Sequence, residues 1–68
     1  MADINKQVGD NIRRYRNKMG LSQEELAFEA RLHRAYIGQI ERGEKNMGLI
    51  NLEKIAKALK ISVDKLVR

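Results

Sequence analysis

Residues 22–43 constrain the fold most, because they predict two short helices joined by a tight turn. Ser22 and Glu25 have the spacing of a capping box, in which the Ser22 hydroxyl accepts from the Glu25 amide while the Glu25 carboxylate reaches back, so a helix is expected over residues 23–30. A joint follows at Arg31 and Leu32. A second helix is then expected over residues 34–42, ending at Gly43. Since helices this short are marginal alone, the flanking segments must supply a supporting core.

The flanking segments carry helical apolar patterns. Residues 1–5 are expected to be a loose leader, with Asp3 or Asn5 as a helix cap. From Lys6 to Gly20 one helix is predicted by an apolar stripe at spacings of four, three and four: Val8, Ile12, Tyr15 and Met19. A further helix starts near Leu49 and carries Leu52, Ile55, Ala56 and Leu59; Ser62 caps a last short one with Val63, Leu66 and Val67. The prediction is an all-α chain of five helices and no strands, forming one domain over residues 1–68.

Composition narrows the function classes. The 68 residues include no cysteine, which excludes disulfides and thiolate metal sites, and no proline, which favours uninterrupted helices. The net charge of +5 and the pI near 9.9 favour a polyanionic partner, first nucleic acid and second an anionic membrane surface; plain solubility is the simplest alternative. No apolar run approaches the roughly 18 residues of a membrane span, and no signal-peptide core is present, so a cytoplasmic location is expected.

The second helix of the pair has two unlike sides. On a helical wheel, Ile37 and Ile40 point one way, whereas small or hydrogen-bonding residues point the other way: Ala35, Gly38, Gln39 and Arg42. Such a side suits the DNA major groove, which admits an α-helix and displays hydrogen-bonding base edges; a glycine there permits close approach. An ordinary solvated helix face is the alternative.

Two charged residues on the inward sides of their helices predict a structural ion pair. Glu41 falls beside Ile37 and Ile40, and Arg16 falls at the matching place on the first helix. A half-buried charge requires a partner, so these two side chains are expected to pair and to fix the position of the second helix. Ala27 is small where the two short helices cross, which sets the angle between them.

Three segments resemble the Cro/C1-type (XRE-type) helix-turn-helix regulators: IRRYRNKMGLSQEELA, YIGQIERGEKN and NLEKIAKALKIS. The resemblance covers nearly the whole chain. It implies a compact, five-helix, lambda-repressor-like domain whose helix-turn-helix motif, residues 22–43, places its second helix in the major groove of double-stranded DNA. By position it implies base contacts from His33, Arg34, Ala35 and Gln39. It implies phosphate contacts from Gln23, Tyr36, Arg42, Lys45 and Asn46. The Arg16–Glu41 pair also occurs in that family.

Within that family the chain is most similar to the controller proteins of restriction–modification systems, which implies a bacterial or phage-encoded regulator that acts at the nucleoid. A homodimer on an inverted-repeat operator is expected. Its interface is predicted at the C-terminal apolar residues Leu49, Leu52, Leu59, Ile61, Val63, Leu66 and Val67. A phage-type repressor is the alternative regulator. An antitoxin-like interaction module and a membrane-surface bundle are alternatives of other classes, although Phe28 is the only Phe or Trp that a membrane surface could use.

Three residues qualify the resemblance. Arg31 occupies a turn position where the family often has glycine, and a positive φ there would cost about 1 kcal/mol. Gly48 replaces the usual serine cap of the fourth helix, with little expected effect. His33 has two readings, a DNA contact or a helix cap. With a single histidine and no nucleophile–base pair, no metal, cofactor, small-molecule ligand or catalysis is expected.

Overall fold

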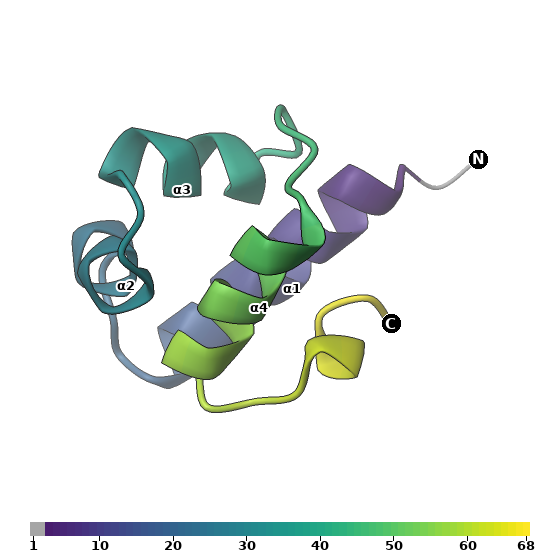
Figure 1. Cartoon of the computed structure of the whole chain (residues 1–68). Coiled ribbons are helices and arrows are strands. Elements are labelled where there is room, and N and C mark those ends of the chain that lie inside the picture. The colour runs from purple at the N-terminus through teal and green to yellow at the C-terminus, as the bar shows by residue number, and fades with distance from the viewer. Residues whose placement is uncertain (1–2) are drawn as a thin grey trace.

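Four α-helices and one 3-10 turn make up the part of the chain that the computed structural model describes, residues 3–68 (Figure 1). In chain order they are α1 (Ile4–Lys18), α2 (Gln23–Ala30), α3 (Arg34–Glu41), α4 (Leu49–Ala58) and the turn η1 (Val63–Lys65). Figure 1 shows α3 across the top of the molecule, α2 nearly end-on beneath its first turn, and α4 in front of α1. The predicted all-α class is confirmed for these residues.

The helix ends follow the capping signals of the sequence. At the start of α1 the Asp3 carboxylate accepts from the Asn5 N–H at 3.0 Å, so Asp3 is the cap. At the start of α2 the Ser22 hydroxyl accepts from the Glu25 N–H at 3.0 Å, and the Glu25 carboxylate accepts from the Ser22 N–H at 2.8 Å, which confirms the capping box. Gly20 and Gly43, with φ of +72° and +76°, follow the C-caps of α1 and α3.

The predictions at the two ends of the chain need correction. Ile4 and Asn5, assigned to a loose leader, belong to α1, whereas Met1 and Ala2 lie outside the described residues. The fifth helix is only the short turn η1, so the described chain has four α-helices rather than five. The Asn11 side-chain amide donates to the Leu66 carbonyl at 2.9 Å and to the Arg68 carbonyl at 3.0 Å, which turns this segment back onto α1 instead of along a helix axis.

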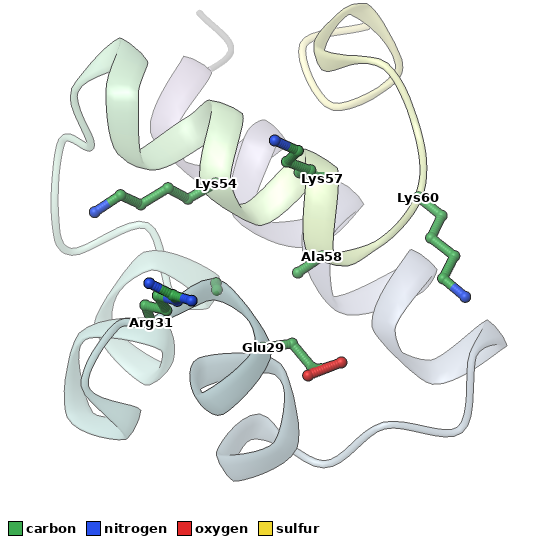
Figure 2. A pocket seen from close by; sticks show the side chains of 7 residues that line it. Glu29, Arg31, Lys54, Lys57, Ala58 and Lys60 are labelled. Atoms are coloured by element: carbon green, nitrogen blue, oxygen red, sulfur yellow. The ribbon is translucent and has the colours of Figure 1, made fainter.

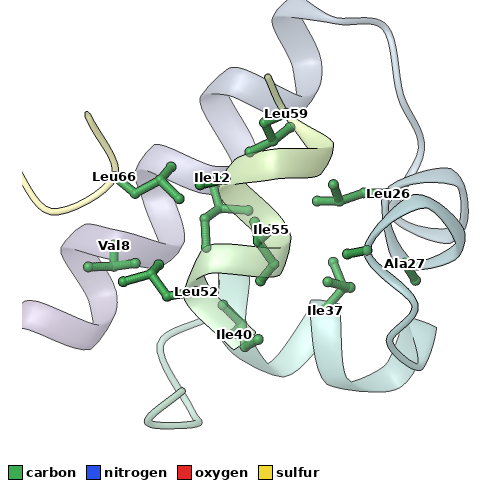
Figure 3. Packing of buried hydrophobic residues seen from close by; sticks show 12 residues of the cluster. Val8, Ile12, Leu26, Ala27, Ile37, Ile40, Leu52, Ile55, Leu59 and Leu66 are labelled. Atoms are coloured by element: carbon green, nitrogen blue, oxygen red, sulfur yellow. The ribbon is translucent and has the colours of Figure 1, made fainter. Parts of the chain in front are cut away.

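All four α-helices and the segment after η1 contribute to one apolar core (Figure 3). Full burial of a Leu or Ile side chain contributes about 1.5–3 kcal/mol, so this cluster is the main stabilising element of a small chain. Tyr15 packs against it from the side, but Met19, predicted on the same stripe of α1, is 41% exposed and is not part of it. The members are Val8, Ile12, Leu26, Ala27, Ala30, Ile37, Ile40, Leu52, Ile55, Ala56, Leu59 and Leu66.

Three of the residues predicted for a dimer interface belong to this core, and for them the prediction is wrong. Leu52, Leu59 and Leu66 are 9%, 2% and 0% exposed, so they have almost no surface to offer a second copy. The helical pattern marked them as apolar but did not say whether the core of one chain would use them. Leu49 and Val67 are exposed, and Ile61 and Val63 are half-buried.

Gly9 allows α1 to pack directly on the end of α3. A Cβ atom at Gly9 would lie 2.8 Å from the carbonyl oxygen of Glu41, inside contact distance of a backbone atom that cannot move away. The backbones of α1 and α3 therefore approach more closely here than any side chain would permit. This contact holds the end of α3 against α1.

Candidate nucleic-acid interface

The turn between α2 and α3 is closed by a left-handed residue. Arg31 has φ 59° and ψ 44°, so the positive φ considered from the sequence is present at a non-glycine position. Its N–H donates to the Phe28 carbonyl at 3.2 Å, and the Leu32 N–H donates to the Ala27 carbonyl at 2.9 Å. The left-handed conformation costs a non-glycine residue roughly 1–2 kcal/mol, which the packing of α2 against α3 must offset.

The predicted ion pair between Arg16 and Glu41 is confirmed. Arg16 Nε lies 2.7 Å from Glu41 Oε2, and Arg16 Nη2 lies 3.0 Å from Oε1, so the contact is bidentate. Arg16 Nη1 also donates to the Leu21 carbonyl at 2.9 Å. The Gln23 side-chain amide donates to Glu41 Oε1 at 3.2 Å. Because Glu41 is only 1% exposed, this network ties the end of α3 to α1 and to the first turn of α2.

Several residues on the outward side of α3, or at its start, make no side-chain hydrogen bond or ion pair among residues 3–68. Arg34 and Ala35 are exposed, and Gln39 is half-buried. His33 occupies the N-cap position with extended backbone angles, but its side chain makes no capping hydrogen bond, so a side-chain cap is not its role here. Among residues 3–68, the side chains of His33, Arg34 and Gln39 take part in none of the hydrogen bonds or ion pairs.

A shallow groove of about 330 Å³ runs along this side of α3. We refer to it as the α3 groove; its lining is Gln23, Arg34, Ala35, Gly38, Gln39 and Arg42. Gly38 faces this groove, as expected, but the neighbouring side chains cover it and leave it buried. A Cβ atom there would lie 3.2 Å from Arg42 Nη1 and 3.7 Å from Gln23 Oε1, so this glycine makes room for two long polar side chains over the groove.

The residues predicted to contact phosphates fall into two groups. Lys45 and Asn46 are exposed in the loop after α3, and their side chains make no hydrogen bond or ion pair among the described residues. Gln23, Tyr36 and Arg42 already have partners. The Tyr36 hydroxyl accepts from the Asn51 side-chain amide at 3.0 Å.

Arg42 is paired with Glu44 at the surface. Arg42 Nε lies 2.8 Å from Glu44 Oε2. This hydrogen bond, together with the charge of the carboxylate, raises the pKa of Arg42, and the same hydrogen bond lowers the pKa of Glu44. Since both side chains are more than half exposed, the pair is weak and can open for a stronger anion.

Sequence reasoning missed several polar contacts and one exposed residue. The bond from Gln23 to Glu41 and the bond from Asn51 to Tyr36 join side chains distant in sequence, and the Asn11 amide reaches a backbone carbonyl far along the chain. Helical periodicity carries no signal for any of these contacts. Ile50 is 73% exposed, and its place beside Leu49 at the start of α4 was the available signal. Among residues 3–68, His, Asp and Glu side chains form no cluster that could hold a metal, and no helix has the length and apolarity to cross a bilayer.

Comparison with known proteins assigns this arrangement of α2 and α3 to a family. The family model HTH_3, described as helix-turn-helix, matches residues 12–66. The chain belongs to the HTH_3 family. This HTH_3 chain is 51% identical over 65 residues to the control protein C.SmaI of Serratia marcescens, covering 96% of this chain and 77% of that protein. It is 56% identical over 52 residues to the control protein C.BamHI of Bacillus amyloliquefaciens, covering 75% of this chain and 64% of that protein.

Solved structures share the same fold. The restriction-modification controller protein C.AhdI from Aeromonas hydrophila superimposes with a TM-score of 0.89 at 44% identity, covering 91% of this chain and 94% of that one. The biofilm regulator SinR, crystallised in complex with DNA, gives a TM-score of 0.86 at 35% identity, covering 90% and 98%. The resemblance drawn from the sequence is confirmed: this is a DNA-binding transcriptional regulator of the helix-turn-helix type, close to restriction–modification controller proteins.

Proposed function

We propose that this HTH_3 regulator binds as a homodimer to an inverted-repeat operator and controls a restriction–modification system. The observation that carries the proposal is a contrast between the two sides of α3. On its outward side Arg34 and Gln39 have no side-chain partner among residues 3–68, and on its inward side a buried ion pair fixes the helix in place. A recognition helix needs both features, because base readout requires free hydrogen-bonding tips at a fixed position. The relative SinR, solved in complex with DNA, and the controller relatives support this reading.

Four residues are the proposed base contacts: three at the start of α3, and Gln39 in its last turn. Arg34 carries the donors that suit guanine, and Gln39 carries the donor and acceptor that suit adenine. The Ala35 methyl group suits apolar contact with the methyl group of thymine. His33 is exposed at the N-cap position, at the start of α3, and we propose that its ring contacts a base edge or an adjacent phosphate.

The proposed phosphate contacts surround the α3 groove. Gln23 is the first residue of α2, where free backbone N–H groups and the helix dipole favour an anion. Lys45 and Asn46 supply contacts from the loop after α3. Arg42 would exchange the Glu44 carboxylate for a phosphate, and the Tyr36 hydroxyl would add a phosphate to its bond from Asn51.

Exposed apolar residues near the start of α4 and after it supply the proposed dimer interface. Leu49 is 71% exposed and lies next to Ile50, which extends the surface predicted from the sequence. Val67, with the half-buried Ile61 and Val63, adds the C-terminal part. A two-fold axis through this surface would make the interface isologous. It would place the two α3 helices about 34 Å apart, roughly one turn of DNA.

Sedimentation equilibrium tests the dimer. We expect a dimer at tens of micromolar, and a shift toward monomer when Leu49 and Val67 are both replaced by Lys. Phe28→Lys is the matched control, because Phe28 is 80% exposed on α2 and lies outside the proposed interface. A wild-type chain that remains monomeric at these concentrations, or equal dissociation of both variants, would contradict the proposal.

A further inference from the structure

A second groove, separate from the α3 groove, lies between the end of α2 and the exposed side of α4 (Figure 2). We call it the basic groove. It has a volume of about 410 Å³ and shares no lining residue with the α3 groove. Ala30 and Ala58 are its small apolar lining, and Glu29 is its one carboxylate. Four cationic side chains surround it: Arg31, Lys54, Lys57 and Lys60.

These four cations are unpaired within residues 3–68. Elsewhere in the described chain, Arg13 pairs with Asp10, Arg16 with Glu41, Arg42 with Glu44, and Arg68 with Asp64. The cations of the basic groove take part in none of the recorded ion pairs, side-chain hydrogen bonds or cation–π contacts. Four positive charges around one groove, opposed by a single carboxylate, give a local field that attracts anions.

Two of the four cations occupy backbone positions where glycine would be less costly. Arg31 and Lys60 both have φ 59°, and they are the non-glycine residues with positive φ among residues 3–68. A left-handed non-glycine residue costs roughly 1–2 kcal/mol. The chain therefore keeps a cationic side chain on each side of the groove despite this cost.

The chemistry of the basic groove favours a polyanion with repeated charges over other ligands. Partner proteins anchor through aromatic or aliphatic side chains in apolar pockets, and two alanines provide no such pocket. Small-molecule sites enclose most of their ligand, whereas this groove lies open between two helices. Lys54 and Lys57 are three residues apart on one side of α4, and lysines of this kind act as mobile point charges toward phosphates.

We propose that the basic groove binds the phosphate backbone of duplex DNA, as a sequence-independent contact additional to that of the α3 groove. The proposal rests on the proposed function, because it adds a second contact to a regulator that α3 holds on DNA. The backbone could come from the flank of the same duplex or from a second duplex segment. Both sources present the same chemistry, and duplex length distinguishes them.

The test compares two double variants with the same change in net charge. Lys54→Gln/Lys57→Gln removes two cations from the basic groove, and Lys18→Gln/Lys65→Gln removes two exposed cations elsewhere. Lys54→Arg/Lys57→Arg keeps the charge and should behave as wild type. Affinity is measured against salt concentration on duplexes that carry the sequence selected by the wild-type chain. One is trimmed to roughly 20 base pairs, which spans two half-sites of about ten, and one is extended on both sides with random sequence.

We expect the groove variant to lose about 1.8 per bound protomer from the slope of log affinity against log salt, since each of two lost phosphate contacts contributes about 0.9. If the flank of the same duplex is bound, this loss appears only on the extended duplex. If a second duplex is bound, wild-type protein saturated with trimmed duplex takes up a separate labelled duplex, and the groove variant does not. Two results would overturn the proposal. One is the same salt slope for the groove and control variants, and the other is the full reduction of the slope when the protein binds a single trimmed duplex. Failure of the proposed function would appear differently, as an absence of sequence preference in the wild-type chain.

Discussion

Polar side chains on the two sides of α3 differ in the hydrogen bonds that they make within the chain. On the inward side Glu41 is buried and accepts three hydrogen bonds, two from Arg16 and one from Gln23. On the outward side Arg34 and Gln39 make no side-chain bond within the described chain. Glu41 therefore finds all its partners within the chain, whereas Arg34 and Gln39 leave their hydrogen-bonding groups to the solvent or to a ligand.

This difference separates positioning from recognition. A buried charge without a partner is costly, so the Arg16–Glu41 pair leaves the end of α3 only one arrangement. Exposed groups without partners lose little in water and are free to bond with base edges. A chain of this size can therefore hold α3 in a fixed position while leaving the polar groups of its outward side available to a ligand.

The largest effect is expected from Glu41→Ala, which breaks the positioning side. It leaves Arg16 in a mostly buried site without its carboxylate, so the free energy of unfolding should fall by about 3–5 kcal/mol. Urea unfolding followed by circular dichroism measures this loss. Glu44→Ala is the control, because it removes a carboxylate from an exposed pair and should leave stability nearly unchanged. A loss below about 1 kcal/mol for Glu41→Ala would remove the pair from its positioning role.

Gly9→Ala tests the inward side of α3 through its backbone contact with α1. Helix propensity alone predicts that alanine stabilises α1 by about 0.5–1 kcal/mol. The new Cβ would lie 2.8 Å from the Glu41 carbonyl oxygen, so we expect a loss of about 1–3 kcal/mol instead. The sign of the change in the thermal unfolding midpoint decides between helix propensity and the clash. A gain in stability would show that α1 and α3 can move apart at little cost.

Arg34→Ala and Lys45→Ala sharpen the recognition side without touching the core. Arg34→Ala should weaken binding to the preferred sequence by about 1–3 kcal/mol and relax the preference at one base pair. Lys45→Ala should weaken binding to all sequences alike and flatten the salt slope by about one. Fluorescence anisotropy on matched and altered duplexes separates these effects. If both variants change only nonspecific binding, the division into base and phosphate contacts is wrong.

Arg31→Gly acts on the turn between the two helices and should raise stability. Glycine adopts φ 59° without the Cβ clash, so a gain of about 1 kcal/mol is expected in chemical denaturation. Arg31→Ala is the control, because it removes the charge and keeps the Cβ atom. Equal stabilities for the two variants would show that the left-handed turn stores no strain.

The smallest effect concerns the capping box of α2. The backbone N–H of Ser22, followed by its hydroxyl, lowers the pKa of Glu25 in the folded chain. A carboxylate with a lowered folded pKa stabilises the fold above its unfolded value of about 4.3, and this contribution is lost as pH falls through the folded pKa. Glu25→Gln should therefore show a slightly shallower loss of stability below about pH 5 than wild type. Glu24→Gln is the matched control, and the same slope in both variants would contradict the assignment.

The sequence predicted the helix-turn-helix pair accurately because its signals are local. The capping box at Ser22 and the stop at Gly43 fixed the ends of α2 and α3 to within one residue. The Arg16–Glu41 pair was also predictable, because two charges fell on apolar sides of neighbouring helices. A helical wheel is sufficient to predict such a pair where one side of each helix is buried.

The rest depended on contacts between distant parts of the chain. Leu52, Leu59 and Leu66 were assigned to a second copy, because an apolar pattern does not distinguish a core from an interface. The turn η1 replaced a fifth helix through the amide of Asn11, whose partners are far away in sequence. The basic groove combines Arg31 with lysines of α4, and periodicity within one helix does not bring these together.

Selection of bound sequences from a random duplex pool at fixed salt tests the central claim, that α3 reads DNA within a symmetric dimer. We expect an enriched inverted repeat whose half-sites are centred about ten base pairs, roughly 34 Å, apart or a multiple of that spacing. The Arg34→Ala variant should lose the preference at one position in each half-site. A pool without enrichment, or an enriched site without two-fold symmetry, would contradict the account.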